Sequence, residues 1–93
     1  MVVGVLTIEI HLPECHSLKD KRRVIKSVAD RLRGRHNISL AEIDAQDLWQ
    51  RAVIGIAAVS LHQQHVETLF ERITMEVESQ IPGDIVDRSV TYV

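Results

Sequence analysis

In the stretch VVGVLTIEIHL, residues 2–12, an apolar start is followed by apolar and polar side chains that alternate with a period of two. From Leu6 onward its even positions are large aliphatic residues, and Thr7, Glu9 and His11 lie between them. Successive side chains of a strand point to opposite faces, so this alternation predicts a β-strand with one face against a core. Pro13 ends the pattern, because proline cannot donate a hydrogen bond within a sheet.

The segment that follows predicts a helix running to about His36. Ser17 is a suitable N-cap, and Asp20, three residues later, completes a capping-box-like pair. One helical stripe is apolar and comprises Leu18, Ile25, Val28, Ala29 and Leu32. Gly34 is expected to end the helix. Lys21 falls beside the apolar stripe, so we expect its stem to pack while its ammonium reaches water at the helix end.

The rest of the chain supplies a strand pair, a helix and a last strand. The apolar positions change parity within the first of these strands, which predicts a bulge or a strand end. Gly55, in the middle of the second, permits the close approach of another group. The expected ranges are a strand over 37–47, a strand over 49–60, a helix over 62–80 and a strand over 84–93.

The order β-α-β-β-α-β predicts an α+β fold of the ferredoxin-like class. In this two-layer sandwich a four-stranded antiparallel sheet carries both helices on one face, and the first and third strands are central. Those two strands are the most apolar in the sequence, which supports the same topology. A chain of 93 residues is long enough for one core, so we expect a single domain over residues 1–93.

Charge is distributed very unevenly along the chain. Between Lys19 and Arg35, eight Lys or Arg residues face two Asp, a net charge of +6, whereas the remainder carries −8. An exposed basic helix offers the sequence-independent attraction that nucleic-acid phosphates require. The candidate nucleic-acid-binding residues are Lys19, Arg23, Lys26 and Arg33, flanked by Arg22, Arg31 and Arg35.

Two interpretations of this helix remain open. It can bind RNA or the ribosome, or it can be a solvated face whose charge is met by the acidic remainder of the protein or by a protein partner. RNA bound on the sheet is not expected, because RNA-recognition sheets stack bases on aromatic side chains. The third strand has Ala, Val, Ile and Gly in those places.

The face of the sheet without helices is expected to carry an apolar patch. Such a patch on a small protein typically meets another chain, which predicts a homo-oligomer, a dimer in the simplest case. The alternative is that Trp49 or a chain end covers it. The self-association candidates are Val3, Val5, Val53, Ala57 and Val59.

Catalysis is not expected. Cys15 lies ahead of a helix N-terminus near Lys19, which favours a lowered thiol pKa, and His11 and His16 are close in sequence. These are too few and too closely spaced for a structural zinc site, and no acid is placed to orient a histidine base. We therefore expect no catalytic residue, no metal and no cofactor.

The cysteine count and the hydropathy suggest a location. A single cysteine fits a reducing cytoplasm, and no apolar run approaches the ~18 residues of a membrane span. We expect a cytoplasmic protein with no membrane partner.

Four segments resemble the YlxP-like family, a group of small bacterial proteins of ferredoxin-like fold with no assigned biochemical function. They are Val3–Leu6, Ser17–Arg23, Ala41–Asp44 and Asp47–Ala52, and the resemblance runs through nearly the whole chain. Genes of this family tend to lie among genes for translation initiation, transcription elongation and ribosome maturation. The resemblance therefore implies a role in or near translation, and it carries over no site residue.

Overall fold

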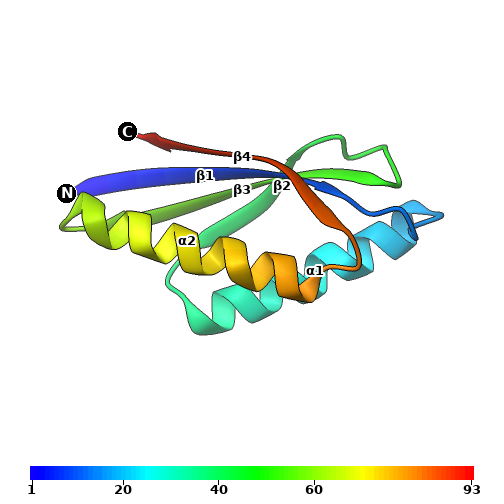
Figure 1. Cartoon of the computed structure of the whole chain (residues 1–93), viewed down its shortest axis with the longest axis horizontal. Coiled ribbons are helices and arrows are strands. Elements are labelled where there is room, and N and C mark those ends of the chain that lie inside the picture. The colour runs from blue at the N-terminus through cyan, green and yellow to red at the C-terminus, as the bar shows by residue number, and fades with distance from the viewer.

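The computed structural model describes all 93 residues and has the element order β-α-β-β-α-β. Four strands form one antiparallel sheet in the order β2-β3-β1-β4, so the first and third strands are central. Both helices lie on the same side of this sheet, and the two termini lie at the same end (Figure 1). The predicted ferredoxin-like sandwich is confirmed. The elements are β1 Val2–His11, α1 Leu18–Arg35, β2 Ser39–Asp44, β3 Arg51–Ser60, α2 Gln63–Gln80 and β4 Asp84–Tyr92.

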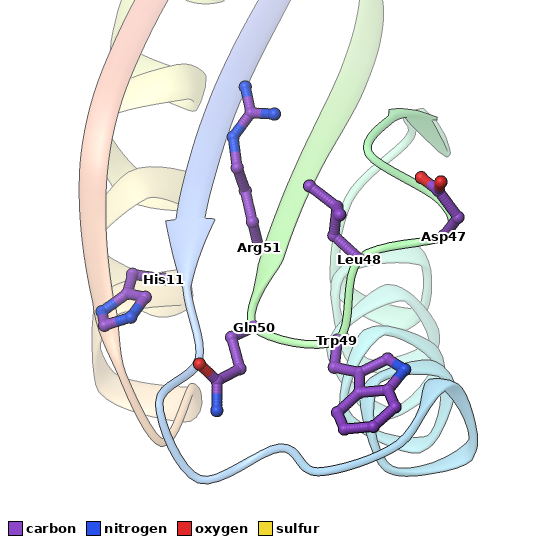
Figure 2. Close-up of a pocket in the computed structure, with 6 residues that line it drawn as sticks. All are labelled: His11, Asp47, Leu48, Trp49, Gln50 and Arg51. Atoms are coloured by element: carbon purple, nitrogen blue, oxygen red, sulfur yellow. The ribbon is translucent and has the colours of Figure 1, made fainter.

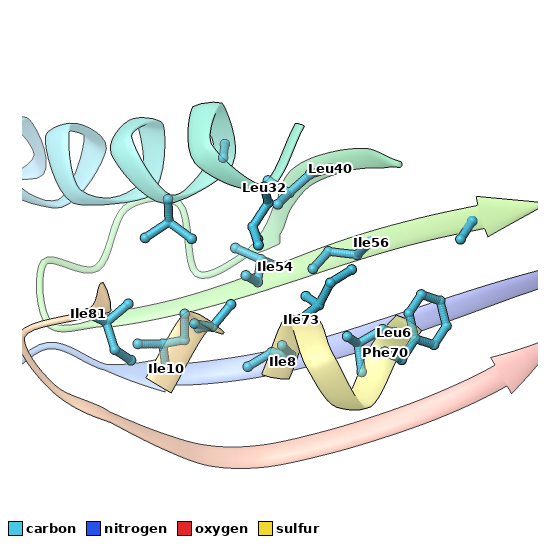
Figure 3. Packing of buried hydrophobic residues seen from close by; sticks show 14 of the residues in the cluster. Leu6, Ile8, Ile10, Leu32, Leu40, Ile54, Ile56, Phe70, Ile73 and Ile81 are labelled. Carbon is cyan, nitrogen blue, oxygen red and sulfur yellow. The ribbon is translucent and has the colours of Figure 1, made fainter. Parts of the chain in front are cut away.

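The core fills the space between the sheet and the helices (Figure 3). The predicted alternation of β1 places Leu6, Ile8 and Ile10 in this core with no exposed surface. From α2, Phe70 and Ile73 are equally buried. Because only one aromatic ring is fully buried here, branched aliphatic side chains supply most of the packing.

Gly4 allows α2 to approach the central strand closely. A Cβ added at Gly4 would lie 2.5 Å from Val66 Cγ1 and 3.0 Å from Phe70 Cε2. Any larger residue would therefore push the second helix away from β1. Neither helix is apolar over enough of its length to cross a membrane.

Both ends of α1 lie where the sequence predicts them, but Gly34 does not end the helix. The Ser17 hydroxyl accepts from the Asp20 backbone N–H at 3.0 Å, and the Asp20 carboxylate accepts from the His16 N–H at 3.1 Å. Gly34 lies inside the helix, which continues to Arg35 and is capped by His36. No glycine of the chain has a positive φ, so the expected glycine stop is wrong.

The strand expected over 37–47 is shorter, and the one expected from Trp49 starts later. Residues 45–50 form a loop, which Ala45 enters with a φ of 58°. The predicted bulge is confirmed between Glu42 and Asp44. It turns Ile43 over Gly55, where an added Cβ would lie 3.1 Å from Ile43 Cγ2, so Ile43 is the group that approaches this glycine.

Candidate functional site

The first turn of α1 is fixed by a buried lysine. The Nζ of Lys21 donates to the carbonyls of Ala45 at 2.7 Å, Gln46 at 3.3 Å and Arg51 at 3.3 Å. These three acceptors use its three N–H donors, and the Glu42 carboxylate, 2.8 Å away, balances its charge. The side chain of Lys21 has no exposed surface, so the expectation that its ammonium reaches water is wrong. The β2–β3 loop and the strand residues on either side of it supply the partners that make its burial possible.

Five of the seven basic candidates share one side of α1. At 100° per residue, Arg22, Arg33, Lys26, Lys19 and Arg23 fall within about a quarter of the helix circumference. We call these five residues the basic stripe; all are exposed. The other two candidates, Arg31 and Arg35, lie on the opposite edge of the helix, so the structure does not gather all seven into one surface.

Few of these cations are neutralised within the chain. Lys26 pairs with Asp30 at 2.8 Å, one helical turn away, which lowers the pKa of Asp30. Arg33 donates to the carbonyl of Leu40 at 2.6 Å, an uncharged acceptor that leaves its positive charge uncompensated. The basic stripe therefore contains one ion pair for five cations.

The acidic second helix meets α1 away from the basic stripe. Glu76 accepts from Arg35 Nη1 at 2.7 Å and lies 2.7 Å from His36 Nε2. Burial raises the pKa of Glu76, but the hydrogen bonds from Arg35 and His36 outweigh it, and the pKa is lowered overall. The remaining acids of this helix form no ion pair with α1. The acidic remainder of the chain thus neutralises one edge of α1 and leaves the basic stripe open.

A shallow hollow of about 240 Å³ lies between α1 and β2. Arg22, Lys26 and Arg33 line it together with Ile25 and Ala29. Because β2 is an edge strand, one side of its backbone is unpaired within the sheet. The stripe therefore borders a groove with cationic side chains and free backbone groups, and Arg22, expected only as a flank, is one of the residues that line it.

The open face of the sheet carries the expected apolar residues in register. Val3 is opposite Val59 and Val5 is opposite Ala57. Val59 is 57% exposed, but Val53 is 8% exposed and offers little surface. Figure 2 shows Leu48 projecting back over the start of β3, so part of the β2–β3 loop, and neither Trp49 nor a chain end, covers this end of the face.

The same end of the open face is charged. Arg51 donates to the Glu9 carboxylate at 2.8 and 3.2 Å across the two central strands. The hydrogen bond from Arg51 lowers the pKa of Glu9. The apolar patch is consequently confined to the half of the face near Val3 and Val59.

Cys15 is not placed as an activated nucleophile. Its side chain is 4% exposed, and desolvation raises the pKa of the thiol, with the Asp20 carboxylate adding to the effect and Lys21 opposing it. The expectation of a lowered pKa is therefore wrong. No three His, Cys, Asp or Glu side chains gather where they could hold a metal ion.

The sequence patterns do not predict the position of Trp49 on the surface. Trp49, assigned from the sequence to a strand, stands in the β2–β3 loop with 52% of its surface exposed. The neighbouring Gln50 side chain donates to the carbonyls of Pro13 at 3.1 Å and Cys15 at 3.2 Å. This loop is therefore fastened to the segment that leads into α1. A period-two pattern cannot reveal such a contact, because the partners are more than thirty residues apart.

Comparison with known proteins identifies relatives of the sequence and of the fold separately. The model of a protein family of unknown function, DUF503, matches residues 3–90. The uncharacterized protein YlxP of Bacillus subtilis is 36% identical over 78 residues, which cover 84% of this chain and 85% of that protein.

Two solved structures share the fold at low sequence identity. A de novo designed protein with ferredoxin fold is 11% identical with a TM-score of 0.57, covering 100% of this chain and 83% of the design. A putative chlorite dismutase is 12% identical with a TM-score of 0.58, covering 99% of this chain and 44% of that one. At these identities the likeness concerns the fold alone.

Proposed function

The chain belongs to the DUF503 family of proteins of unknown function and is similar to YlxP of Bacillus subtilis, and we propose that it is a binding module for RNA, either free or within the ribosome. The RNA backbone lies along the basic stripe of α1. The observation that supports this most strongly is the stripe itself: five exposed cations on one side of one helix, with a single ion pair among them.

The chemistry of the stripe suits phosphate. Cations that are not paired within the chain release the counterions of a polyanion when they bind it, which favours association at low salt. From Lys19 to Arg33 the stripe extends about 21 Å along the helix axis, at 1.5 Å per residue. Over that length the cations can contact several successive phosphates. Contacts to phosphates do not distinguish one base from another.

A binding role fits the rest of the molecule better than catalysis does. The thiol of Cys15 is buried with a raised pKa, so it is not placed as a nucleophile. The translation context that the family resemblance implies is compatible with an RNA partner, and the arrangement of charge on α1 is independent of that context.

A salt series with single-stranded RNA tests the proposal. The anisotropy of a labelled oligonucleotide of about 16 nucleotides is measured as protein is added. Between about 50 and 200 mM salt, log affinity should fall linearly with log salt, with a slope between about −2 and −3.5 for three to five phosphate contacts. Absence of binding at the lowest salt, or a slope near zero, would contradict the proposal.

A second candidate function is self-association through the open face of the sheet. Val3, Val5, Ala57 and Val59 form a continuous uncharged patch on the two central strands, and Ile43 extends it over Gly55 with 51% of its surface exposed. A patch without charges matches a second apolar surface and offers nothing to phosphate, which favours a second copy of the chain. This dimer would leave the basic stripe free, because the helices lie on the other side of the sheet.

A further inference from the structure

Trp49 is the only tryptophan of the chain and takes no part in the core. Just over half of its surface is in contact with water. Tryptophan carries the largest apolar ring of any residue, and an exposed one on a small protein is typical of a contact surface for a ligand. The chain has so few aromatic residues that this placement stands out.

The loop that presents Trp49 is held rigidly. Two of its carbonyls, those of Ala45 and Gln46, accept from the buried ammonium of Lys21, and the Leu48 N–H closes a turn on the Ala45 carbonyl at 3.0 Å. Ala45 adopts a left-handed φ of 58°, a strained conformation for an L-residue. A loop held by a buried charge and a strained residue presents its side chains in a fixed arrangement, which lowers the cost of ordering them on binding.

Trp49 borders a hollow of about 490 Å³ on the loop surface (Figure 2). The other lining residues are His11, Asp47, Leu48, Gln50 and Arg51. The guanidinium of Arg51 is engaged by Glu9, and the Asp47 carboxylate repels anions. This hollow therefore does not suit a phosphate. It does suit a base, which offers a flat face to the indole and amino groups to a carboxylate.

The loop that carries Trp49 is attached to the N-terminal end of α1, the helix that carries the basic stripe. Lys21, which fastens the loop, is in the first turn of α1, and Lys19, Arg22 and Arg23 surround it in sequence. A strand whose phosphates follow these cations would bring a base within reach of the loop. Base stacking on an aromatic side chain next to a cationic track is the common arrangement in proteins that bind single strands.

We infer that Trp49 is a stacking platform for one unpaired base of an RNA strand whose backbone follows the basic stripe. This inference rests on the proposed function and makes it more specific, because a base inside a duplex has no free face for stacking. The protein would then prefer single-stranded RNA to duplex RNA. A protein partner that takes Trp49 as an apolar anchor is the competing occupant, and the experiment distinguishes the two.

The experiment records two signals in one titration. The emission of Trp49 reports on the indole, and the anisotropy of a labelled single-stranded oligonucleotide reports on binding. We expect the indole emission to be quenched with the same midpoint as the rise in anisotropy. A blunt duplex of the same sequence should bind more weakly and leave the emission unchanged.

Substitutions separate stacking from structure. Trp49→Ala should weaken single-strand binding by about 5- to 150-fold, the usual contribution of one stacked base. Trp49→Phe should retain most of the affinity, and Leu61→Ala, at an apolar position that is 80% exposed in another loop, should bind as the wild type does. Circular dichroism checks that each variant keeps the fold.

The outcomes are distinguishable. Anisotropy that rises while the emission and the Trp49→Ala affinity stay unchanged overturns the stacking site, leaves the basic stripe intact and assigns Trp49 to another partner. Equal quenching by the duplex also overturns stacking. No rise in anisotropy for the wild type overturns the proposed function together with this inference.

Discussion

The ammonium of Lys21 lies 2.8 Å from the carboxylate of Glu42, and the lysine side chain is completely buried. This contact joins the first turn of α1 to the edge strand β2, and its hydrogen bonds extend to the loop that follows. A buried charge is tolerated only where its partners are in place. The pair therefore couples the helix that carries the basic stripe to the loop that carries Trp49.

Replacing Lys21 should destabilise the protein strongly. In Lys21→Met the Glu42 carboxylate and three carbonyls lose their partner, and we expect the free energy of unfolding to fall by about 3–5 kcal/mol. Urea denaturation measures the change. Lys19→Met, on the exposed side of the same turn, is the control and should stay within about 0.5 kcal/mol of the wild type. Equal stability of the two variants would show that the buried contact contributes nothing.

A methyl group at Gly4 should separate α2 from the sheet. Its Cβ would meet Val66, so Gly4→Ala is expected to cost about 1–3 kcal/mol of unfolding free energy. Val66→Ala removes the obstructing group and leaves a cavity instead. The double variant should lose less stability than the two single losses combined, and a double-mutant cycle measures this coupling. Simple additivity would refute the proposed steric conflict.

The contact between the helices should respond to acid. The pKa of Glu76 is lowered in the folded protein, so its contribution to stability is present above the ordinary glutamate pKa of about 4.3 and is lost as the pH falls through the lowered value. The difference in unfolding free energy between the wild type and Glu76→Gln should therefore be positive at pH 7 and shrink on acidification. A difference that is independent of pH would contradict this assignment.

Self-association through the open face of the sheet would double the molecular mass in solution. If a second copy covers the apolar patch, light scattering after gel filtration should give about twice 10.6 kDa, and Val59→Lys should return the mass to that of one chain. Val59 is exposed, so this substitution leaves the core intact. A wild-type protein that remains at 10.6 kDa at high concentration would exclude the dimer.

Much of the fold could be predicted because it follows from local patterns. The alternation in β1 and the apolar stripe of α1 report directly which face is buried, and the order of elements leaves few topologies. The bulge in β2 was also visible, as a change of parity. Gly34 was misleading because a glycine permits a helix to end without requiring it, and here the helix continues by one residue.

The site was less predictable because it depends on contacts between distant segments. The basic residues could be counted from the sequence, but the neutralisation of Arg35 depends on Glu76, some forty residues away. Lys21 was placed correctly beside the apolar stripe, yet two of the three carbonyls that accept its hydrogen bonds belong to a loop that no periodicity describes. Trp49 was assigned to a strand for the same reason. Its apolar side chain fits a strand pattern, but no sequence pattern shows that residues 45–50 form a loop.

Charge reversal within the basic stripe is the decisive test of whether α1 binds RNA. Arg22→Glu with Arg23→Glu is compared with Arg72→Glu with Arg88→Glu, which changes the net charge equally at arginines outside α1. Co-sedimentation of each variant with ribosomal subunits is measured between about 50 and 200 mM salt. We predict that the wild type and the Arg72/Arg88 variant sediment with the subunits at low salt, and that the Arg22/Arg23 variant loses roughly tenfold or more in affinity. A wild-type protein that stays in the supernatant at the lowest salt, or equal losses in the two variants, would contradict the account.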